Sequence, residues 1–252
     1  MQLLTDKVAL ITGSSRGIGA GIARLFARHG AKVTLHGRNL AALAAIQKEV
    51  EEAGGRAIPL AADTTKFDEI EAMRHQIERQ LGPVDILVAN AGGRYTLPAP
   101  IEDIDEAGWR ASLDGNLTAT FLTIKCFLPG MKQRKRGCII TISSAAARRP
   151  HPNSPVPYAA AKAGVSMMTQ HLAAQVGPHN IRVNCIAPET ILTEKNQRRI
   201  PKAQQAMLAE THPIRRLGTV NDVAQAALYL ASENAGWITG IVLDVAGGAV
   251  MV

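Results

Sequence analysis

The stretch Val8-Ala-Leu-Ile-Thr-Gly-Ser-Ser-Arg-Gly-Ile-Gly19 joins a short apolar run to a glycine-rich turn. The run at 8–11 has the length and composition of a buried strand, and a segment with helical periodicity follows the turn. Glycines permit close approach of the backbone to a ligand, and the N–H groups that begin a helix attract a pyrophosphate. The spacing G-x-x-x-G-x-G differs from the commoner G-x-G-x-x-G, so an ordinary strand-to-helix turn is the alternative. The order of strand, turn and helix favours a dinucleotide site.

Beyond this turn, apolar runs of strand length alternate with longer segments of helical periodicity. The expected strands are 8–11, 32–36, 57–61, 86–89, 138–142, 181–186 and 241–245. The expected helices are 18–28, 40–53, 67–80, 103–130, 158–176 and 221–231. Gly30, Gly54 and Gly82 follow the first three helices, where left-handed caps belong, and Thr219 with Asp222 resembles a capping box. The pattern predicts an α/β fold over 1–252: one doubly wound, Rossmann-type domain with a parallel sheet of about seven strands covered by helices on both faces.

The composition favours a small anionic ligand over a nucleic acid. The net charge is +7, but the basic residues form short scattered clusters, and aromatic residues make up only 4% of the chain. A nucleic-acid-binding protein concentrates positive charge on one face and interleaves aromatic side chains for stacking. We therefore expect no nucleic-acid partner.

Cys126, Cys138 and Cys185 have no metal-ligand spacing and lie in apolar surroundings. They are typical of reduced core residues in a cytosolic protein, and we expect no metal site. No apolar run approaches the ~18 residues that span a bilayer. The sequence predicts a soluble cytoplasmic protein without a membrane partner.

The end of the second strand bears on the choice of cofactor. An NAD site usually places an acidic residue about 20 residues beyond the glycine turn. This position holds Gly37, followed by Arg38. A guanidinium forms charge-assisted hydrogen bonds with a 2′-phosphate, and Arg16 adds a second positive charge. The sequence therefore favours NADP(H) over NAD(H), the alternative being that Arg38 is a solvated loop residue.

Tyr158 and Lys162 lie four residues apart and therefore share one face of a predicted helix. A phenol has an ordinary pKa near 10, and a neighbouring ammonium favours its ionised form. The pair predicts a proton-transfer site in which Lys162 lowers the pKa of Tyr158. Decoration of a helix surface is the alternative when this spacing is considered alone.

The chain resembles the short-chain dehydrogenase/reductase family along essentially its whole length, and within it the 3-oxoacyl-carrier-protein reductases. The matching elements, in order, are Thr12-Gly-x-x-x-Gly-x-Gly19, Asn90-Ala91-Gly92, Asn116, Ser144, Tyr158-x-x-x-Lys162, Pro188 with Thr193, and Thr239-Gly240. The resemblance implies a nicotinamide-dependent oxidoreductase acting on a carbonyl or alcohol.

The resemblance also implies roles for single residues. Tyr158 would be the general acid or base, and Lys162 would lower its pKa and bind the nicotinamide ribose. Ser144 would polarise the substrate oxygen, with Ser143 as its competitor. Asn116 would hold a water in a proton relay, or else be a buried residue at a helix bend. The implied cofactor contacts are Gly13, Ser15, Arg16, Gly17, Ile18, Gly19, Arg38, Asp63, Asn90, Ala91, Gly92, Tyr158, Lys162, Pro188 and Thr193. For Asp63, implied to contact the adenine, capping of a turn is the alternative.

The sequence departs from the family pattern at two places. Glu189 stands where a glycine commonly follows Pro188, which leaves the loop geometry and the role of Thr193 open. The segment between Ser144 and Tyr158 is one residue longer than in typical relatives and contains four prolines. The expected substrate loops are 94–100, 148–157 and 189–212, where Arg94, Arg148 and Arg149 either attract an anionic or thioester-linked substrate or remain solvated.

The leading hypothesis is an NADP(H)-dependent carbonyl reductase for a small ketone or a 3-oxoacyl thioester. An NAD-dependent alcohol dehydrogenase for a sugar, polyol or steroid-like alcohol is the second hypothesis. A non-catalytic dinucleotide-binding redox sensor is the third. The family resemblance implies a homotetramer, with a dimer as the alternative.

Overall fold

The computed structural model describes residues 2–151 and 153–251, and a seven-stranded parallel sheet forms its centre. The strands lie in the order β3-β2-β1-β4-β5-β6-β9, and every neighbouring pair is parallel. Their bounds are β1 Val8–Ile11, β2 Lys32–Gly37, β3 Arg56–Ala61, β4 Ile86–Ala89, β5 Gly137–Ile142, β6 Ile181–Pro188 and β9 Val242–Val245. The predicted α/β, doubly wound fold is confirmed.

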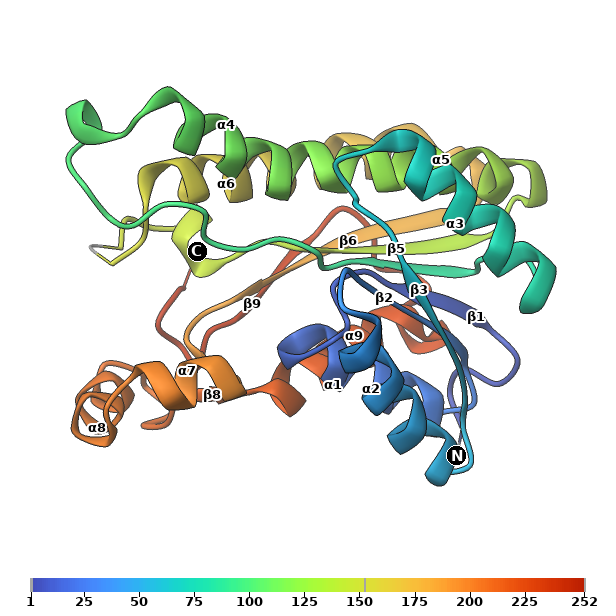
Figure 1. Cartoon of the computed structure of the whole chain (residues 1–252), viewed down its shortest axis with the longest axis horizontal. Helices are drawn as coiled ribbons and strands as arrows, with labels where there is room; N and C mark the ends of the chain where they lie inside the picture. The colour runs from blue at the N-terminus through green and yellow to red at the C-terminus, as the bar shows by residue number, and fades with distance from the viewer. Residues whose placement is uncertain (1, 152, 252) are drawn as a thin grey trace.

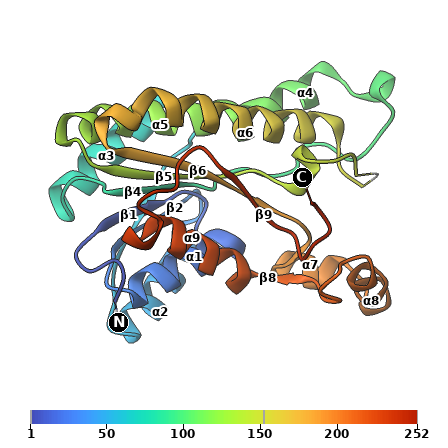
Figure 2. The same ribbon diagram turned by 180° about the vertical axis from the view of Figure 1, so that it is seen from behind.

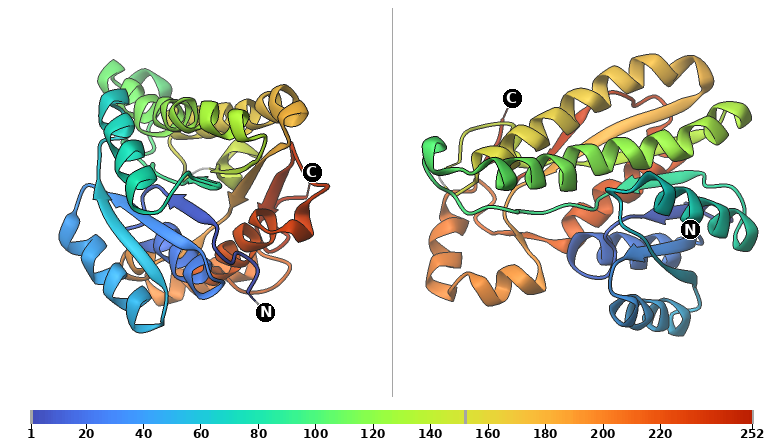
Figure 3. Two further views of the ribbon diagram at one scale, coloured as in Figure 1. Left: turned by 90° about the vertical axis from the view of Figure 1, so that its right-hand side faces the viewer. Right: turned by 45° about the horizontal axis from the view of Figure 1, so that its top comes forward.

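Helices cover both faces of this sheet (Figures 1 and 3). One layer contains α1 Gly17–Arg28, α2 Leu40–Glu52 and α9 Val220–Ala231. The opposite layer contains α3 Phe67–Gln80, α4 Glu106–Leu113, α5 Ala119–Arg134 and α6 Val156–Val176. Successive side chains of a strand point to opposite faces of the sheet. Ile140 therefore packs in the core under α1, α2 and α9, and its neighbour Ile139 packs in the core on the other face. Burial on both faces explains why β1 and β4 are apolar throughout.

The local signals for helix ends are also confirmed. Gly30, Gly54 and Gly82 adopt positive φ angles of 89°, 78° and 99°. Thr219 and Asp222 form the reciprocal hydrogen bonds of a capping box at the start of α9.

Cys126, Cys138 and Cys185 are buried free thiols. Within the part of the chain that the structure describes, no helix has the length and apolar character needed to cross a membrane.

The prediction of one helix over 103–130 is wrong in detail. Asp105 caps α4 by accepting a 2.7 Å hydrogen bond from the Gly108 N–H, and a π-helical turn, Asp114–Thr118, separates α4 from α5. Continuous apolar periodicity hides such a turn, because it inserts one residue without breaking the helix.

The segment after β6 contains elements that the sequence did not indicate. These are β7 Ile191–Leu192, α7 Glu194–Arg199, α8 Lys202–Glu210 and β8 Gly218–Thr219, with β7 paired to β8. Figure 2 shows α7, α8 and β8 together at one end of the molecule. Neither helix has a buried residue, so no apolar stripe could reveal them. Short 3₁₀ turns complete the described chain at Ile101–Asp103, Ala145–Ala147, Gly177–His179 and Glu233–Ala235.

His36 fixes the glycine turn against the sheet. Its ring Nδ1 accepts a 3.2 Å hydrogen bond from the Gly13 N–H, and its Nε2 lies 3.0 Å from the Ala62 carbonyl oxygen. A neutral ring with the proton on Nε2 satisfies both contacts. The side chain is 3% exposed, and burial lowers the pKa of His36 from its ordinary value of 6.5. The turn is therefore held by a neutral histidine.

Acidification should destabilise the protein through His36. Below pH 6.5 the unfolded chain binds a proton that the folded state resists, so the free energy of unfolding falls by up to about 1.4 kcal/mol per pH unit. His36→Asn keeps an acceptor for the Gly13 N–H and should lose less stability between pH 7.5 and 5.5. Urea unfolding at several pH values measures this, with His75→Asn at an exposed histidine as the control. Identical pH dependence in the wild type and His36→Asn would contradict the assignment.

Candidate active site

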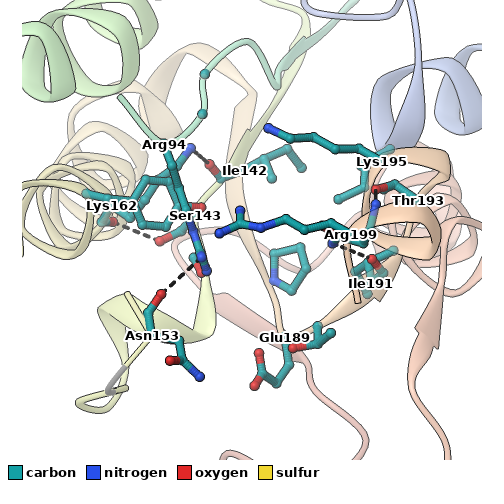
Figure 4. A pocket seen from close by; sticks show the side chains of 18 of the residues that line it. Arg94, Ile142, Ser143, Asn153, Lys162, Glu189, Ile191, Thr193, Lys195 and Arg199 are labelled. Carbon is teal, nitrogen blue, oxygen red and sulfur yellow. Dashed lines mark hydrogen bonds between the residues drawn. The ribbon is translucent and has the colours of Figure 1, made fainter. Parts of the chain in front are cut away.

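A cavity of about 680 Å³ opens at the carboxyl ends of the central strands (Figure 4). The strand order reverses between β1 and β4, and ligands of doubly wound sheets bind at such a switch point. The glycine turn, the loop after β4, the end of β5, the start of α6 and the segment after β6 all contribute to its lining. The sequence elements that the resemblance combined therefore meet in this lining, except for Asn116 and Thr239-Gly240, which lie outside it.

Thr12 and Asn90 join the two loops at the switch point. Thr12 Oγ1 accepts hydrogen bonds from the Asn90 and Ala91 N–H groups at 3.0 and 2.9 Å. The Asn90 side-chain amide donates to the carbonyl oxygens of Thr12 and Gly13 at 2.8 and 3.1 Å. The side chain of Asn90 is therefore committed to supporting the turn.

The residues around this turn fit a dinucleotide pyrophosphate. Gly13 has φ of 66°, and a Cβ on it would lie 3.0 Å from the Ala91 Cα. Arg16, the N-cap of α1, provides no side-chain cap, so the first N–H groups of the helix are free for an anion. A Cβ on Gly17 would lie 3.3 Å from Thr193 Cγ2, which places Thr193 directly against the turn. At Gly13 and Gly17 a side chain would therefore crowd the neighbouring loops.

The implied cofactor residues divide into two groups. Those that line the cavity are Gly13, Arg16, Ile18, Gly19, Asn90, Gly92, Tyr158, Lys162, Pro188 and Thr193. Those that lie outside it are Ser15, Gly17, Arg38, Asp63 and Ala91. Arg38 and Asp63 follow the adjacent strands β2 and β3, and the exposed Arg38 guanidinium helps to lower the pKa of the Asp63 carboxyl.

Asp63 caps a turn. Its Oδ1 accepts hydrogen bonds from the N–H and the hydroxyl of Thr65 at 2.9 and 2.8 Å. These two bonds are the main reason that the pKa of Asp63 lies below its ordinary value. The contacts of Asp63 are therefore those of a residue that caps a turn, which was the alternative to an adenine contact. The adenine contact itself remains a prediction.

Tyr158 lies in the first turn of α6, which begins at Val156 with Pro157 in a position that suits a helix start. Burial raises the pKa of Tyr158, and Glu189 raises it further, whereas a hydrogen bond with Ser144 and the charge of Arg94 lower it. The sequence predicts that Lys162 lowers this pKa. Burial is the dominant effect in this structure, Ser144 and Arg94 oppose it, and the effect of Lys162 remains a prediction.

The Lys162 ammonium is 3% exposed and donates a 2.7 Å hydrogen bond to the Ile142 carbonyl oxygen at the end of β5. Burial lowers the pKa of Lys162 to about 8. Its Nζ lies 5.9 Å from the centroid of the Tyr158 ring. The lysine therefore anchors α6 to β5 beside the phenol.

The two serines after β5 have different environments. Ser143 Oγ donates to the Lys162 carbonyl oxygen at 2.8 Å and accepts a 2.8 Å hydrogen bond from Ser166. Ser144 Oγ accepts a 3.2 Å hydrogen bond from the Ala146 N–H and contacts Tyr158. Ser143 thus joins β5 to α6, and Ser144 is the serine beside the phenol.

Asn116 occupies the π-helical turn and is fully buried. Its Oδ1 accepts a 3.0 Å hydrogen bond from the Gly93 N–H, and its Nδ2 donates to the carbonyl oxygens of Gly93 and Ser112 at 2.9 and 2.8 Å. The side chain ties the loop after β4 to the turn between α4 and α5. Its role in a water relay remains a prediction.

Glu189 replaces the family's glycine without distorting the backbone. Its N–H donates a 3.1 Å hydrogen bond to the Val245 carbonyl oxygen, which continues the pairing of β6 with β9, and its φ is not positive. Its carboxylate lines the cavity at 3.9 Å from His151 Nε2. The departure therefore adds a carboxylate to the cavity, and the backbone at Glu189 continues the strand pairing.

All three predicted substrate loops reach the cavity, but not through every predicted residue. Arg94 and Pro98 come from the first loop, and His151 and Asn153 from the second. Arg148 is paired with Asp244 at 3.1 Å, and neither Arg148 nor Arg149 lines the cavity. Lys195 and Arg199 of α7 line it, although sequence reasoning did not single them out. Their spacing of four residues was the available signal.

Known proteins resemble this chain over almost its entire length. A family model described as enoyl-(acyl carrier protein) reductase matches residues 13–250. The 7alpha-hydroxysteroid dehydrogenase of Escherichia coli K12 is 40% identical over 98% of this chain and 95% of its own. The 3-oxoacyl-(acyl-carrier-protein) reductase FabG of Chlamydia muridarum is 37% identical over 98% of both chains.

The fold agrees with these sequence matches. A solved 7alpha-hydroxysteroid dehydrogenase in complex with NADH and 7-oxo glycochenodeoxycholic acid has a TM-score of 0.92 and 38% identity, with 99% of this chain and 96% of that chain covered. The protein therefore belongs to the short-chain dehydrogenase/reductase family of oxidoreductases.

Proposed function

We propose that the protein is an NADP(H)-dependent oxidoreductase that interconverts a ketone and a secondary alcohol. The observation that carries the proposal is the convergence of Tyr158, with its Ser144 hydrogen bond, and the glycine turn on one cavity. A phenol whose pKa is raised stays protonated at neutral pH and suits the role of general acid.

The chain's own groups supply binding and proton transfer. The bound nicotinamide supplies the hydride. Tyr158 Oη gives its proton to the carbonyl oxygen as negative charge develops there, and the Ser144 hydroxyl stabilises that oxygen by a hydrogen bond. Lys162 holds α6 against β5 and keeps a positive charge beside the phenol. Asn116 fixes the loop after β4.

Tyr158→Phe tests the chemistry. The variant should lower kcat/KM for NADPH-dependent ketone reduction by about 100-fold to 10,000-fold, the range of general acid catalysis. The dissociation constant of NADPH, measured by fluorescence titration, should change less than about threefold. Tyr229→Phe at an exposed tyrosine of α9 is the matched control. A redox sensor would bind NADPH and turn over no ketone in any variant, and full activity of Tyr158→Phe would refute the mechanism.

The NADP(H) preference rests on Arg38, which follows β2 and is exposed beside Asp63. Arg38→Gln should weaken NADPH binding about 10-fold to 100-fold, since a hydrogen bond to a charged group contributes about 1.5–3 kcal/mol. The dissociation constant of NADH should change less than about twofold. The control is Arg110→Gln at an exposed arginine of α4, which should change the dissociation constants of NADPH and NADH less than about twofold. Tighter binding of NADH than of NADPH by the wild type would favour the alternative, an NAD-dependent alcohol dehydrogenase. This alternative is supported by the similar 7alpha-hydroxysteroid dehydrogenase, whose structure was solved with NADH.

We also propose a homotetramer. The helices α4, α5 and α6 form an outer layer on one side of the sheet (Figure 3, right). Trp109, Phe121 and Met167 on these helices are 37%, 48% and 55% exposed. Such side chains gain free energy when a second copy covers them. Light scattering at micromolar concentration should give four times the mass of the chain, and a monomer would refute the proposal.

A further inference from the structure

The cavity beside Tyr158 carries more positive charge than proton transfer requires. Besides Lys162, its described lining includes Arg16, Arg94, Lys195 and Arg199. Among those described residues, Glu189 is the sole acid. Several cations around one cavity raise the local concentration of an anion and slow its escape.

Arg94 holds its charge next to the reacting group. Its Nη1 donates a 3.0 Å hydrogen bond to the Asn153 carbonyl oxygen, and its guanidinium carbon lies 5.8 Å from the centroid of the Tyr158 ring. The backbone carbonyl is neutral, so the positive charge remains uncompensated. A substrate carbonyl that accepts a proton from Tyr158 would thus lie close to the Arg94 guanidinium.

Arg199 and Lys195 approach from the opposite wall. They lie one turn apart on α7, and Figure 4 shows both side chains extending into the cavity. None of the ion pairs found within 2–151 and 153–251 includes Arg94, Lys195 or Arg199. Arg148, by contrast, is neutralised by Asp244.

The remaining lining combines polar and apolar groups. Asn153, Asn196 and Gln204 face the cavity together with the neighbouring His151 and Glu189. The apolar members are Ile18, Pro98, Ile142, Pro188, Ile191, Ile200 and Leu208. Hydroxyl groups of a substrate find hydrogen-bond partners among the polar side chains.

The geometry points to a small oxo acid, and the corresponding hydroxy acid, as the substrate class, with the carboxylate bound by Arg94 and Arg199. This inference rests on the proposed function. Hydroxyl groups elsewhere on the substrate would face His151 and Glu189. The hydride goes to the carbonyl carbon and the Tyr158 proton to its oxygen, while the carboxylate stays unchanged.

Matched acids and esters test the assignment. NADPH oxidation is measured with 2-oxobutanoate and 3-oxobutanoate, each beside its methyl ester. For at least one position of the oxo group, kcat/KM of the acid should exceed that of the ester about 10-fold or more. Arg94→Gln and Arg199→Gln should each raise KM for that acid about 10-fold and change KM for the ester less than threefold. Arg198→Gln, on the same helix but outside the cavity lining, should behave as the wild type.

A binding measurement separates this inference from the proposed function. Calorimetric titration of Tyr158→Phe saturated with oxidised cofactor compares 2- and 3-hydroxybutanoate with their methyl esters. Tighter binding of an acid, lost in Tyr158→Phe/Arg94→Gln, supports the inference even when no ketone is turned over, an outcome that would refute the proposed function alone. Equal or weaker binding of both acids would overturn the inference. Reduction of the esters at least as fast as the acids for both positions of the oxo group would do the same.

Discussion

The hydrogen bonds between Thr12, Asn90 and Ala91 are the constraint on which the site depends. They draw together the loops after β1 and β4, where the strand order reverses. Two loops can approach so closely only if their buried polar groups are paired and their crowded positions lack side chains. Gly13 and Gly19 meet the second condition, and the Asn90 amide helps to meet the first.

The same network reaches outward on both sides of the switch point. The Gly13 N–H donates a hydrogen bond to His36 on β2, and the Gly93 N–H donates one to Asn116 in the π-helical turn. The cofactor cradle and the turn before α5 are thereby parts of one hydrogen-bonded structure. A displacement of either loop would leave buried amide groups without partners, which costs about 1–3 kcal/mol for each group. This explains why residues distant in sequence keep a fixed geometry around the cavity.

The sequence predicted the strands almost to the residue because burial on both faces produces uninterrupted apolar runs. It also grouped Ser144, Tyr158 and Lys162, through their order along the chain, and these three line one cavity, whereas their catalytic roles remain predictions. It did not predict α7 and α8, whose side chains are solvated, or the π-helical turn, which preserves apolar periodicity. It left Arg148 either attracting a substrate or solvated, and it did not predict the ion pair with Asp244, because the two residues are 96 positions apart and only the fold brings them together. Long-range pairing of charges is the information that local patterns lack.

Burial shifts the pKa values of Tyr158 and Lys162 in opposite directions, because it disfavours the charged form of each side chain. It raises the pKa of Tyr158 and lowers that of Lys162 to about 8. Arg94 and Glu189 then act on Tyr158 with opposite signs from two different substrate loops. Since Glu189 keeps the extended backbone of β6, its effect on the site is one of charge. The residues that would select the substrate thus also set how readily the phenol releases its proton, so binding and proton transfer are coupled through the same side chains.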